Sequence, residues 1–353
     1  MSVEGVLKAG RSWALSRRSA GIVVSSRLRL ARNVRGEVFP WKSGSDDSRR
    51  LFERLSGVMC KLESLTDAVV MPMDKLEVVE RGLLCERRLI SRDLAGRGAG
   101  SGVVVAEKQR VAVMINEEDH LRMQVIRAGL DLISGWKLLD RVDSEIESYI
   151  DYAYTPELGY LTACPSNVGT GMRASVMLHL PGLKLLDEID RVITGLNRMG
   201  FAVRGTFGEG SEDFGNMYQV SNQTTLGLSE GEIVKRVNDV AEKLVVLERN
   251  ARGRLLQKRE IYVRDYVNRG FGIANYAEVM ASGEGLDLLS ALRFGVELGM
   301  VGGVSVEKVN ELMLLIQPGH LQNSLKKELS AGERDGLRAK LVRRKLKNMK
   351  LIR

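Results

Sequence analysis

Arginines at five places in the sequence have the chemistry to bind a polyphosphate. Arg27 and Arg29 alternate with leucines in an extended run, so both guanidinium groups share one face of a strand. A guanidinium group donates paired hydrogen bonds to phosphate oxygens and stays protonated at neutral pH. Taken singly, each arginine is explained as readily by a surface ion pair, so the hypothesis depends on their being gathered together. The other three are Arg122, Arg173 and Arg204.

Two of these arginines adjoin glycine-rich segments. Arg173 lies in CPSNVGTGMRASVMLHLP (164–181), where two glycines permit turns closed to other residues and the alternation after Arg173 predicts a strand. Arg204 begins RGTFGEG (204–210). A glycine-rich loop beside a strand is also an ordinary connection. The two loops therefore indicate a phosphate-binding site only in combination with the arginines.

Carboxylates and one thiol could act on a cationic acceptor. Glu117, Glu118 and Asp119 form an acidic cluster, and Glu209 lies in the second glycine-rich segment. A guanidinium acceptor is protonated and a poor nucleophile, so a kinase acting on it needs carboxylates that orient it and remove a proton. The same carboxylates could instead hold Mg²⁺ or face solvent. Cys164 could add a contact if neighbouring positive charge ionised it, or could simply be structural.

Composition excludes several classes of protein. The chain has 353 residues, few aromatic residues (5%), and only three cysteines and three histidines, without paired spacing. This predicts neither a disulfide framework nor a zinc site, and no residue is expected to ligate a metal. Without a secretory or membrane-spanning segment, the expected location is the cytoplasm. The scarcity of aromatic residues also argues against nucleic-acid binding.

The net charge of +8 is concentrated at one end. Residues 338–353 contain eight Lys or Arg and no acidic residue. Such a basic tail is either the solvated end of a helix or a surface attracted to an acidic partner or to nucleic acid.

Hydrophobic periodicity predicts an α+β fold, with an antiparallel sheet flanked by helices followed by a small all-helical domain. A capping box of Ser229 and Glu232 opens a long helix. After Arg264 only helices are expected, with breaks at the glycine and proline positions. Strands are predicted near 22–34, 103–105, 111–115, 174–179 and 219–226, helices over 48–64, 129–152 and 185–199, and breaks at 283–285, 302–303 and 318–319. The predicted domains are an extension (1–21), the α+β domain (22–255) and the helical domain with its basic tail (256–353).

Four ordered motifs carry a family resemblance. They are SSRLRLARN (25–33), NEEDHLR (116–122), the segment at 164–181 and RGTFGEG (204–210). With them the chain resembles the phosphagen (guanidino) kinases and, among these, the bacterial protein-arginine kinases, over about residues 22–250. The resemblance implies a phosphagen-kinase catalytic domain that uses ATP, with Mg²⁺ held chiefly by the nucleotide.

The resemblance also implies roles for individual residues. Glu118 would be the catalytic base, Glu209 the second guanidinium clamp and Cys164 the thiol near the acceptor. Arg88 stands where the family commonly has a nucleotide-contacting histidine, and the five arginines would contact phosphates. The residues implied to bind ATP are Ser25, Ser26, Arg27, Leu28, Arg29, Arg88, Arg122, Arg173, Ala174, Ser175, Val176, Met177, Arg204, Gly205, Thr206, Phe207, Gly208 and Glu209.

Two features favour a protein substrate over a free guanidino compound. Small-molecule members of the family carry a helical domain before the first motif, whereas 24 residues precede Ser25 here. In addition, RDGLRA (334–339) resembles the RDxxRA motif through which the protein-arginine kinases sense phosphoarginine. This implies an allosteric site at Arg334, Asp335, Arg338 and Ala339.

The leading hypothesis is therefore an ATP-dependent protein-arginine kinase that marks proteins for regulation or Clp-type proteolysis. The alternatives are a free-arginine kinase and a catalytically silent adaptor for a repressor or protease. The resemblance implies several partners: arginine-bearing substrates, an activator protein, a heat-shock repressor, a Clp-type protease and a second copy of the chain. It also implies roles in stress response and protein quality control.

Overall fold

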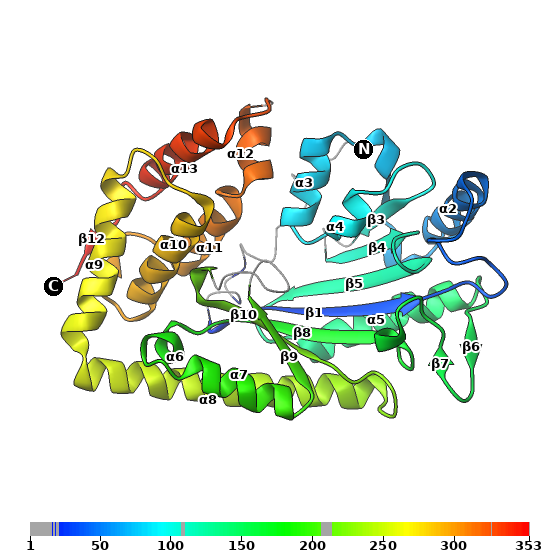
Figure 1. Cartoon of the computed structure of the whole chain (residues 1–353), viewed down its shortest axis with the longest axis horizontal. Coiled ribbons are helices and arrows are strands. Elements are labelled where there is room, and N and C mark those ends of the chain that lie inside the picture. Colours follow the sequence, from blue (N-terminus) through cyan, green and yellow to red (C-terminus); the bar gives the residue numbers. More distant parts are fainter. Residues whose placement is uncertain are drawn as a thin grey trace. The chain divides into compact units, whose positions relative to one another are not determined.

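The computed structural model describes residues 16, 18, 21–106, 110–205, 214–325 and 327–352. Eight strands form one sheet in the order β2-β3-β4-β5-β1-β8-β10-β9 (Figure 1). The strands of this sheet are β1 (Val23–Arg32), β2 (Val69–Pro72), β3 (Gly102–Ala106), β4 (Val111–Ile115), β5 (Leu121–Ala128), β8 (Met172–His179), β9 (Phe201–Gly205) and β10 (Met217–Asn222).

Among the described residues, seven α-helices alternate with the strands of this sheet along the chain, and five further α-helices follow them. The first group comprises α2 (Ser45–Met59), α3 (Val78–Glu86), α4 (Arg92–Ala95), α5 (Leu132–Glu147), α6 (Pro181–Leu185), α7 (Ile189–Arg198) and α8 (Glu230–Lys258). The second comprises α9 (Glu260–Tyr276), α10 (Ser282–Glu297), α11 (Val306–Leu315), α12 (Pro318–Leu325) and α13 (Ala331–Lys345). Two small antiparallel pairs are β6 (Tyr154–Thr155) with β7 (Gly159–Tyr160), and β11 (Val301–Gly302) with β12 (Lys350–Leu351). None of the described helices combines the length and hydrophobicity needed to span a membrane.

The chain divides into two compact units. The first contains residues 26–175 and 221–238, and the second contains 176–220 and 239–353 together with the short segment before residue 26. The predicted domain boundary at residue 255 lies inside α8. It stays a prediction.

The two faces of the sheet differ in the first unit. Paired residues of antiparallel strands project to the same face, and Met114 of β4 pairs with Arg122 of β5. Leu84 of α3 belongs to the same apolar cluster as Met114, so α3 covers this face over β3 and β4. On the opposite face Gly135 of α5 approaches closely, because an added Cβ there would lie 2.6 Å from Leu28 Cδ1. The face that carries Arg122 is thus apolar at one end and polar at the other.

The predicted α+β class and the capping box of Ser229 with Glu232 are confirmed: Glu232 Oε2 accepts hydrogen bonds from both the backbone N–H (2.8 Å) and the hydroxyl (2.7 Å) of Ser229. Some elements differ from prediction. The single helix expected over 185–199 is divided into α6 and α7, because Asp187 has a left-handed backbone (φ 58°). The glycines at 283–285 lie in the first turn of α10 and do not break it, and β11 and β12 are strands where only helices were expected. Strands β2, β5 and β9 were not predicted.

A buried ionic network organises the second unit. Arg293 of α10 is fully buried and donates to His179 Nδ1 (2.6 Å), Asn310 Oδ1 (2.9 Å), Glu297 Oε1 (3.0 Å) and the Gly21 carbonyl (2.7 Å). Burial, and then the adjacent Arg293, lowers the pKa of His179 to about 3, so this histidine is neutral. The guanidinium thereby ties the end of β8 to α10 and α11.

Replacing Arg293 with methionine should lower the free energy of unfolding by about 3 kcal/mol, because Glu297 stays buried without its strongest partner. The urea midpoint followed by circular dichroism measures this. Arg264→Met is the matched control: its ion pair with Glu260 is solvent-exposed, so the change should be below about 0.5 kcal/mol. Equal midpoints for the two variants would contradict the structural role of Arg293.

Candidate active site

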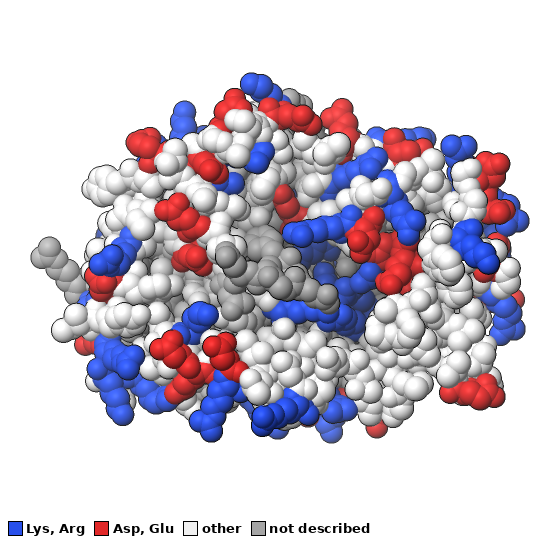
Figure 2. Space-filling view, viewed as in Figure 1, with Lys and Arg blue, Asp and Glu red and all other residues white. Residues whose placement is uncertain are grey.

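Four of the five predicted phosphate-binding arginines lie on three neighbouring strands of the first unit. Arg27 and Arg29 are on β1, which runs between β5, carrying Arg122, and β8, carrying Arg173. All four are partly buried. Figure 2 shows Lys and Arg side chains gathered on the face in view, beside a smaller group of acidic side chains.

Burial and mutual repulsion act most strongly on the two arginines of β1. The Nε–H groups of Arg27 and Arg29 are buried and donate to no acceptor among the described residues. Burial, followed by the charges of Arg88, Arg122 and Arg173, lowers the pKa of Arg27 to about 9. Burial and the same kind of repulsion also lower the pKa of Arg29. Buried polar groups are normally hydrogen-bonded, so orphaned donors among crowded cations fit an anionic ligand with several oxygens.

Arg88 joins the cluster from the turn after α3. Its backbone is left-handed (φ 62°), a conformation that costs free energy in a residue other than glycine. Gln124 of β5 fixes this turn by donating to the carbonyl oxygens of Arg88 (2.6 Å) and Leu89 (3.1 Å). The turn therefore directs a fifth cation toward Arg27, on whose pKa it acts.

Glu117 orients one arginine. Both of its carboxylate oxygens accept hydrogen bonds from Arg122 Nη1 (2.8 and 2.7 Å), and its carbonyl accepts one from Arg97 Nη2 (2.7 Å). Burial acts to raise the pKa of Glu117, but Arg122 outweighs it and the pKa lies below its ordinary value. In the sequence, Glu117 belongs to the same acidic cluster as Glu118. Their separate roles follow from the β4–β5 register, which pairs Ile115 with Leu121 and closes a five-residue loop between them.

Glu118 has the properties of a base. Its side chain is half-buried, and burial, followed by the negative charge of Asp119, raises its pKa above the ordinary value. A carboxylate with a raised pKa binds a proton more strongly, which suits proton removal from a weakly acidic group.

Asp119 ties two loops together. Its Oδ1 accepts hydrogen bonds from Asn33 Nδ2 and from the Ala163 N–H, both at 2.6 Å. Glu118 and Cys164 each lie one residue from this contact and are therefore on neighbouring loops. The half-buried Cys164 places its Sγ 3.0 Å from Ser166 Oγ.

The other predicted ATP-binding residues of β1 and β8 fix these strands. Ser26 Oγ donates to the Gly129 carbonyl (2.7 Å) and accepts from the Asp131 N–H (3.0 Å). Leu28 lies on the α5 face, opposite Arg27 and Arg29, so its side chain points away from the cluster. Ser175 Oγ donates to the Arg27 carbonyl (3.2 Å), and the Ala174 N–H donates to Asn222 Oδ1 (2.8 Å). Ser25, Val176 and Met177 are buried in the same strands.

Part of the predicted site is outside this cluster or outside the described residues. Arg204 and Gly205 end β9 in the second unit. Thr206, Phe207, Gly208 and Glu209 lie outside the described residues. Within the described part of the chain, no three His, Cys, Asp or Glu residues gather as a metal site.

The residues of the predicted phosphoarginine site lie together on α13. Arg338 is buried and donates to the carbonyls of Ile316 (2.9 Å) and Met280 (2.6 Å) and to Asp335 Oδ1 (2.5 Å). The half-buried Arg334 donates to the Leu329 carbonyl (2.6 Å). Ala339 is fully buried behind them. The basic tail is therefore partly the packed face of a helix.

Comparisons with known proteins identify the family to which the chain belongs. A family model described as "ATP:guanido phosphotransferase, C-terminal catalytic domain" matches residues 50–251, and one described as "Protein-arginine kinase McsB C-terminal domain" matches residues 260–352. A solved taurocyamine kinase from Schistosoma mansoni, with transition state analog components bound, has a TM-score of 0.59 at 26% identity, covering 70% of this chain and 37% of that chain. A lombricine kinase structure, with a TM-score of 0.58 at 24% identity over 69% of this chain and 72% of that chain, shares the fold. The family-model match over residues 50–251 shows that the chain is an ATP:guanido phosphotransferase.

The relatives by sequence are more specific. The protein-arginine kinase of Halothermothrix orenii is 43% identical over 325 residues, which are 92% of this chain and 93% of that protein. The protein-arginine kinase of Bacillus subtilis is 41% identical over 327 residues, which are 92% and 90% of the two chains. The chain therefore belongs to the family of the protein-arginine kinases, as the four motifs predicted.

Replacing Arg29 with methionine should stabilise the ligand-free protein by about 1 kcal/mol, because a buried, repelled cation becomes an apolar side chain of similar length. Inorganic tripolyphosphate should raise the melting temperature of the unaltered protein and raise that of the variant much less. Differential scanning fluorimetry measures both effects. The exposed Arg49→Met is the control and should respond like the unaltered protein. A full response to tripolyphosphate by Arg29→Met would contradict the anion site.

Proposed function

We propose that this chain transfers the γ-phosphoryl group of ATP to arginine side chains of proteins. The observation that supports this is the cluster of Arg27, Arg29, Arg88, Arg122 and Arg173 on β1, β5, β8 and the turn after α3, beside the loop of Glu118. The Nε–H groups of Arg27 and Arg29 have no acceptor among the described residues. The names of the relatives support the acceptor.

The cluster fits the phosphates of ATP, which supplies the phosphoryl group. Arg27, Arg29, Arg122, Arg173 and Arg204 would bind its phosphate oxygens and offset the negative charge during transfer. Mg²⁺, held chiefly by the nucleotide, would share that task. Because Glu117 already holds Arg122 and Gln124 already holds the turn of Arg88, little reorganisation of these two arginines is needed when the anion binds.

Glu118 would accept the proton that the acceptor must lose. A bond forms between a guanidinium nitrogen and the γ-phosphorus, the bond from that phosphorus to the departing ADP oxygen breaks, and the nitrogen's proton passes to the carboxylate. The raised pKa of Glu118 strengthens it as a base. Cys164, on the neighbouring loop, and Glu209 would orient the guanidinium group.

Replacing Glu118 with glutamine should lower the rate of transfer about a hundredfold to ten-thousandfold, because the base is lost while the shape is kept. Stabilisation by tripolyphosphate should be unchanged. The measurement is peptide mass spectrometry without acid treatment, since a P–N bond is acid-labile, after incubation with Mg·ATP and an arginine-rich protein. Glu53→Gln, which changes an exposed carboxylate on α2 in the same way, is the matched control.

The same assay with free arginine separates the alternatives. Phosphate on free arginine alone would indicate a free-arginine kinase. No transfer to either acceptor by the unaltered protein would favour a silent adaptor.

We further propose that Arg334, Asp335, Arg338 and Ala339 sense phosphoarginine. The Arg338 contacts join α13 to the segments before α10 and after α11, so a ligand that competes for them would act on the helical core. Free phosphoarginine should change the transfer rate of the unaltered protein but not that of Arg334→Ala, measured from initial rates. Arg344→Ala, exposed on the same helix, should keep the response.

The wider biological role belongs to the same proposal: a cytoplasmic enzyme of stress response and protein quality control, whose partners are an activator protein, a heat-shock repressor and a Clp-type protease. Self-association is supported by exposed apolar residues at and after α9, namely Ile261, Tyr276 and Val279, which are 85%, 81% and 67% exposed. Sedimentation velocity tests the oligomer, and a monomer at all concentrations would refute it. Co-purification of each partner tests the rest.

A further inference from the structure

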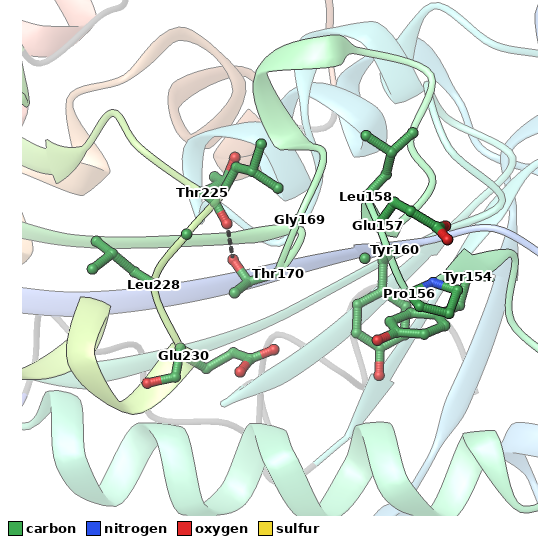
Figure 3. Close-up of a pocket in the computed structure, with 14 residues that line it drawn as sticks. Tyr154, Pro156, Glu157, Leu158, Tyr160, Gly169, Thr170, Thr225, Leu228 and Glu230 are labelled. Atoms are coloured by element: carbon green, nitrogen blue, oxygen red, sulfur yellow. Dashed lines mark hydrogen bonds between the residues drawn. The ribbon is translucent and has the colours of Figure 1, made fainter.

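The first unit contains a pocket that is separate from the arginine cluster. It has a volume of about 700 Å³ and lies among the β6–β7 hairpin, Gly169 and Thr170, and residues 225–230 before and at the start of α8 (Figure 3). None of the residues given a phosphate-binding or catalytic role above lines it. The roles of the catalytic residues therefore do not explain it.

The aromatic wall of this pocket is firmly supported. The guanidinium carbon of Arg32 lies 3.4 Å from the ring centroid of Tyr160, and the Tyr154 ring packs edge-on against Tyr160 at 5.3 Å. Arg32 is itself buried, paired with Asp143 (2.7 Å) and bonded to the Thr170 carbonyl (2.8 Å). The two rings are thus held in place before any ligand arrives.

The pocket lining suits a long basic side chain. Two of the fourteen lining residues, Glu157 and Glu230, are acidic, and none is basic. Leu226 and Leu228 add apolar surface. Figure 3 shows Glu230 extending from the start of α8 toward the side where Tyr160 lies. Aromatic faces and carboxylates together bind an alkyl stem that ends in a cation.

The pocket is continuous with the loop of Cys164. The Tyr160 N–H donates to the Gly169 carbonyl (2.8 Å), and the Thr170 N–H donates to the Thr225 carbonyl (3.0 Å). An added Cβ at Gly159 would lie 2.5 Å from Gly169 O, so these backbones touch directly. Gly169 is five residues from Cys164, a span of about 18 Å at most. An extended polypeptide with its arginine near Cys164 would reach the pocket within about five residues.

We propose that this pocket binds a lysine or arginine side chain of the substrate polypeptide, within about five residues of the arginine that is phosphorylated. The inference rests on the proposed function, because that function places the acceptor arginine beside Cys164. The pocket would select among arginines by their neighbours in the sequence, and would leave the chemistry of transfer unchanged.

Synthetic peptides with a single acceptor arginine test this. One series carries lysine three to five residues away on either side, a second carries alanine there, and a third carries lysine ten residues away. Initial rates give kcat and KM for the unaltered protein, Glu230→Gln, Leu226→Lys and the control Glu53→Gln. Fluorescence anisotropy of the same peptides without nucleotide gives binding separately from transfer.

With the unaltered protein, the near-lysine peptides should have a KM about fivefold below that of the alanine peptides, at equal kcat. Glu230→Gln and Leu226→Lys should remove this preference, the first by losing a carboxylate and the second by adding a competing cation. Distant lysine should have no effect.

Equal KM values for near-lysine and alanine peptides, or equal weakening of both by Glu230→Gln, would overturn the proposal. If no peptide is phosphorylated but anisotropy shows a lysine preference that Glu230→Gln removes, the pocket assignment stands and the proposed function fails. If transfer occurs without any lysine preference, the proposed function stands and the pocket assignment fails.

Discussion

Repulsion among buried arginines is the constraint on which the first unit depends. Three adjacent strands and one turn bring five guanidinium groups together, and the two on β1 find no acceptor for their Nε–H groups within the described part of the chain. Such a cluster opposes folding, since cations are removed from water without full compensation. The surrounding structure must therefore hold it, and the supports are visible: Glu117 against Arg122, Gln124 against the strained turn of Arg88, and α5 packed behind β1.

The contacts that hold the cluster give the three consecutive acidic residues different roles. Glu117 orients Arg122, and Asp119 joins two loops. Glu118 is the remaining carboxylate of the three: it is partly exposed to solvent, and its pKa is raised. A base of this kind depends on the charges beside it. The loop thus sets both the position and the proton affinity of the group that the proposed chemistry requires.

Local sequence patterns predicted much of this arrangement, but not all of it. The alternation of arginine and leucine placed Arg27 and Arg29 on one strand face, and the four motifs identified the family. The strand β5 was missed because its polar residues follow an acidic cluster and resemble a loop. Gln124 is buried there only because it bonds to carbonyls 35 and 36 residues earlier in the chain. The division of the helix at Asp187 and the distinct tasks of three consecutive acids likewise arise from contacts that no short segment reveals.

The direct backbone contact between Gly159 and Gly169 has an evolutionary consequence. Neither position can accept a side chain, since an added Cβ at either would overlap backbone atoms. The join between hairpin and loop is therefore fixed, whereas Leu226 is half-exposed and can vary without disturbing the core. A substitution at Leu226 would therefore change the lining of the proposed side-chain pocket and leave the proposed transfer residues untouched, so the two could change separately in evolution.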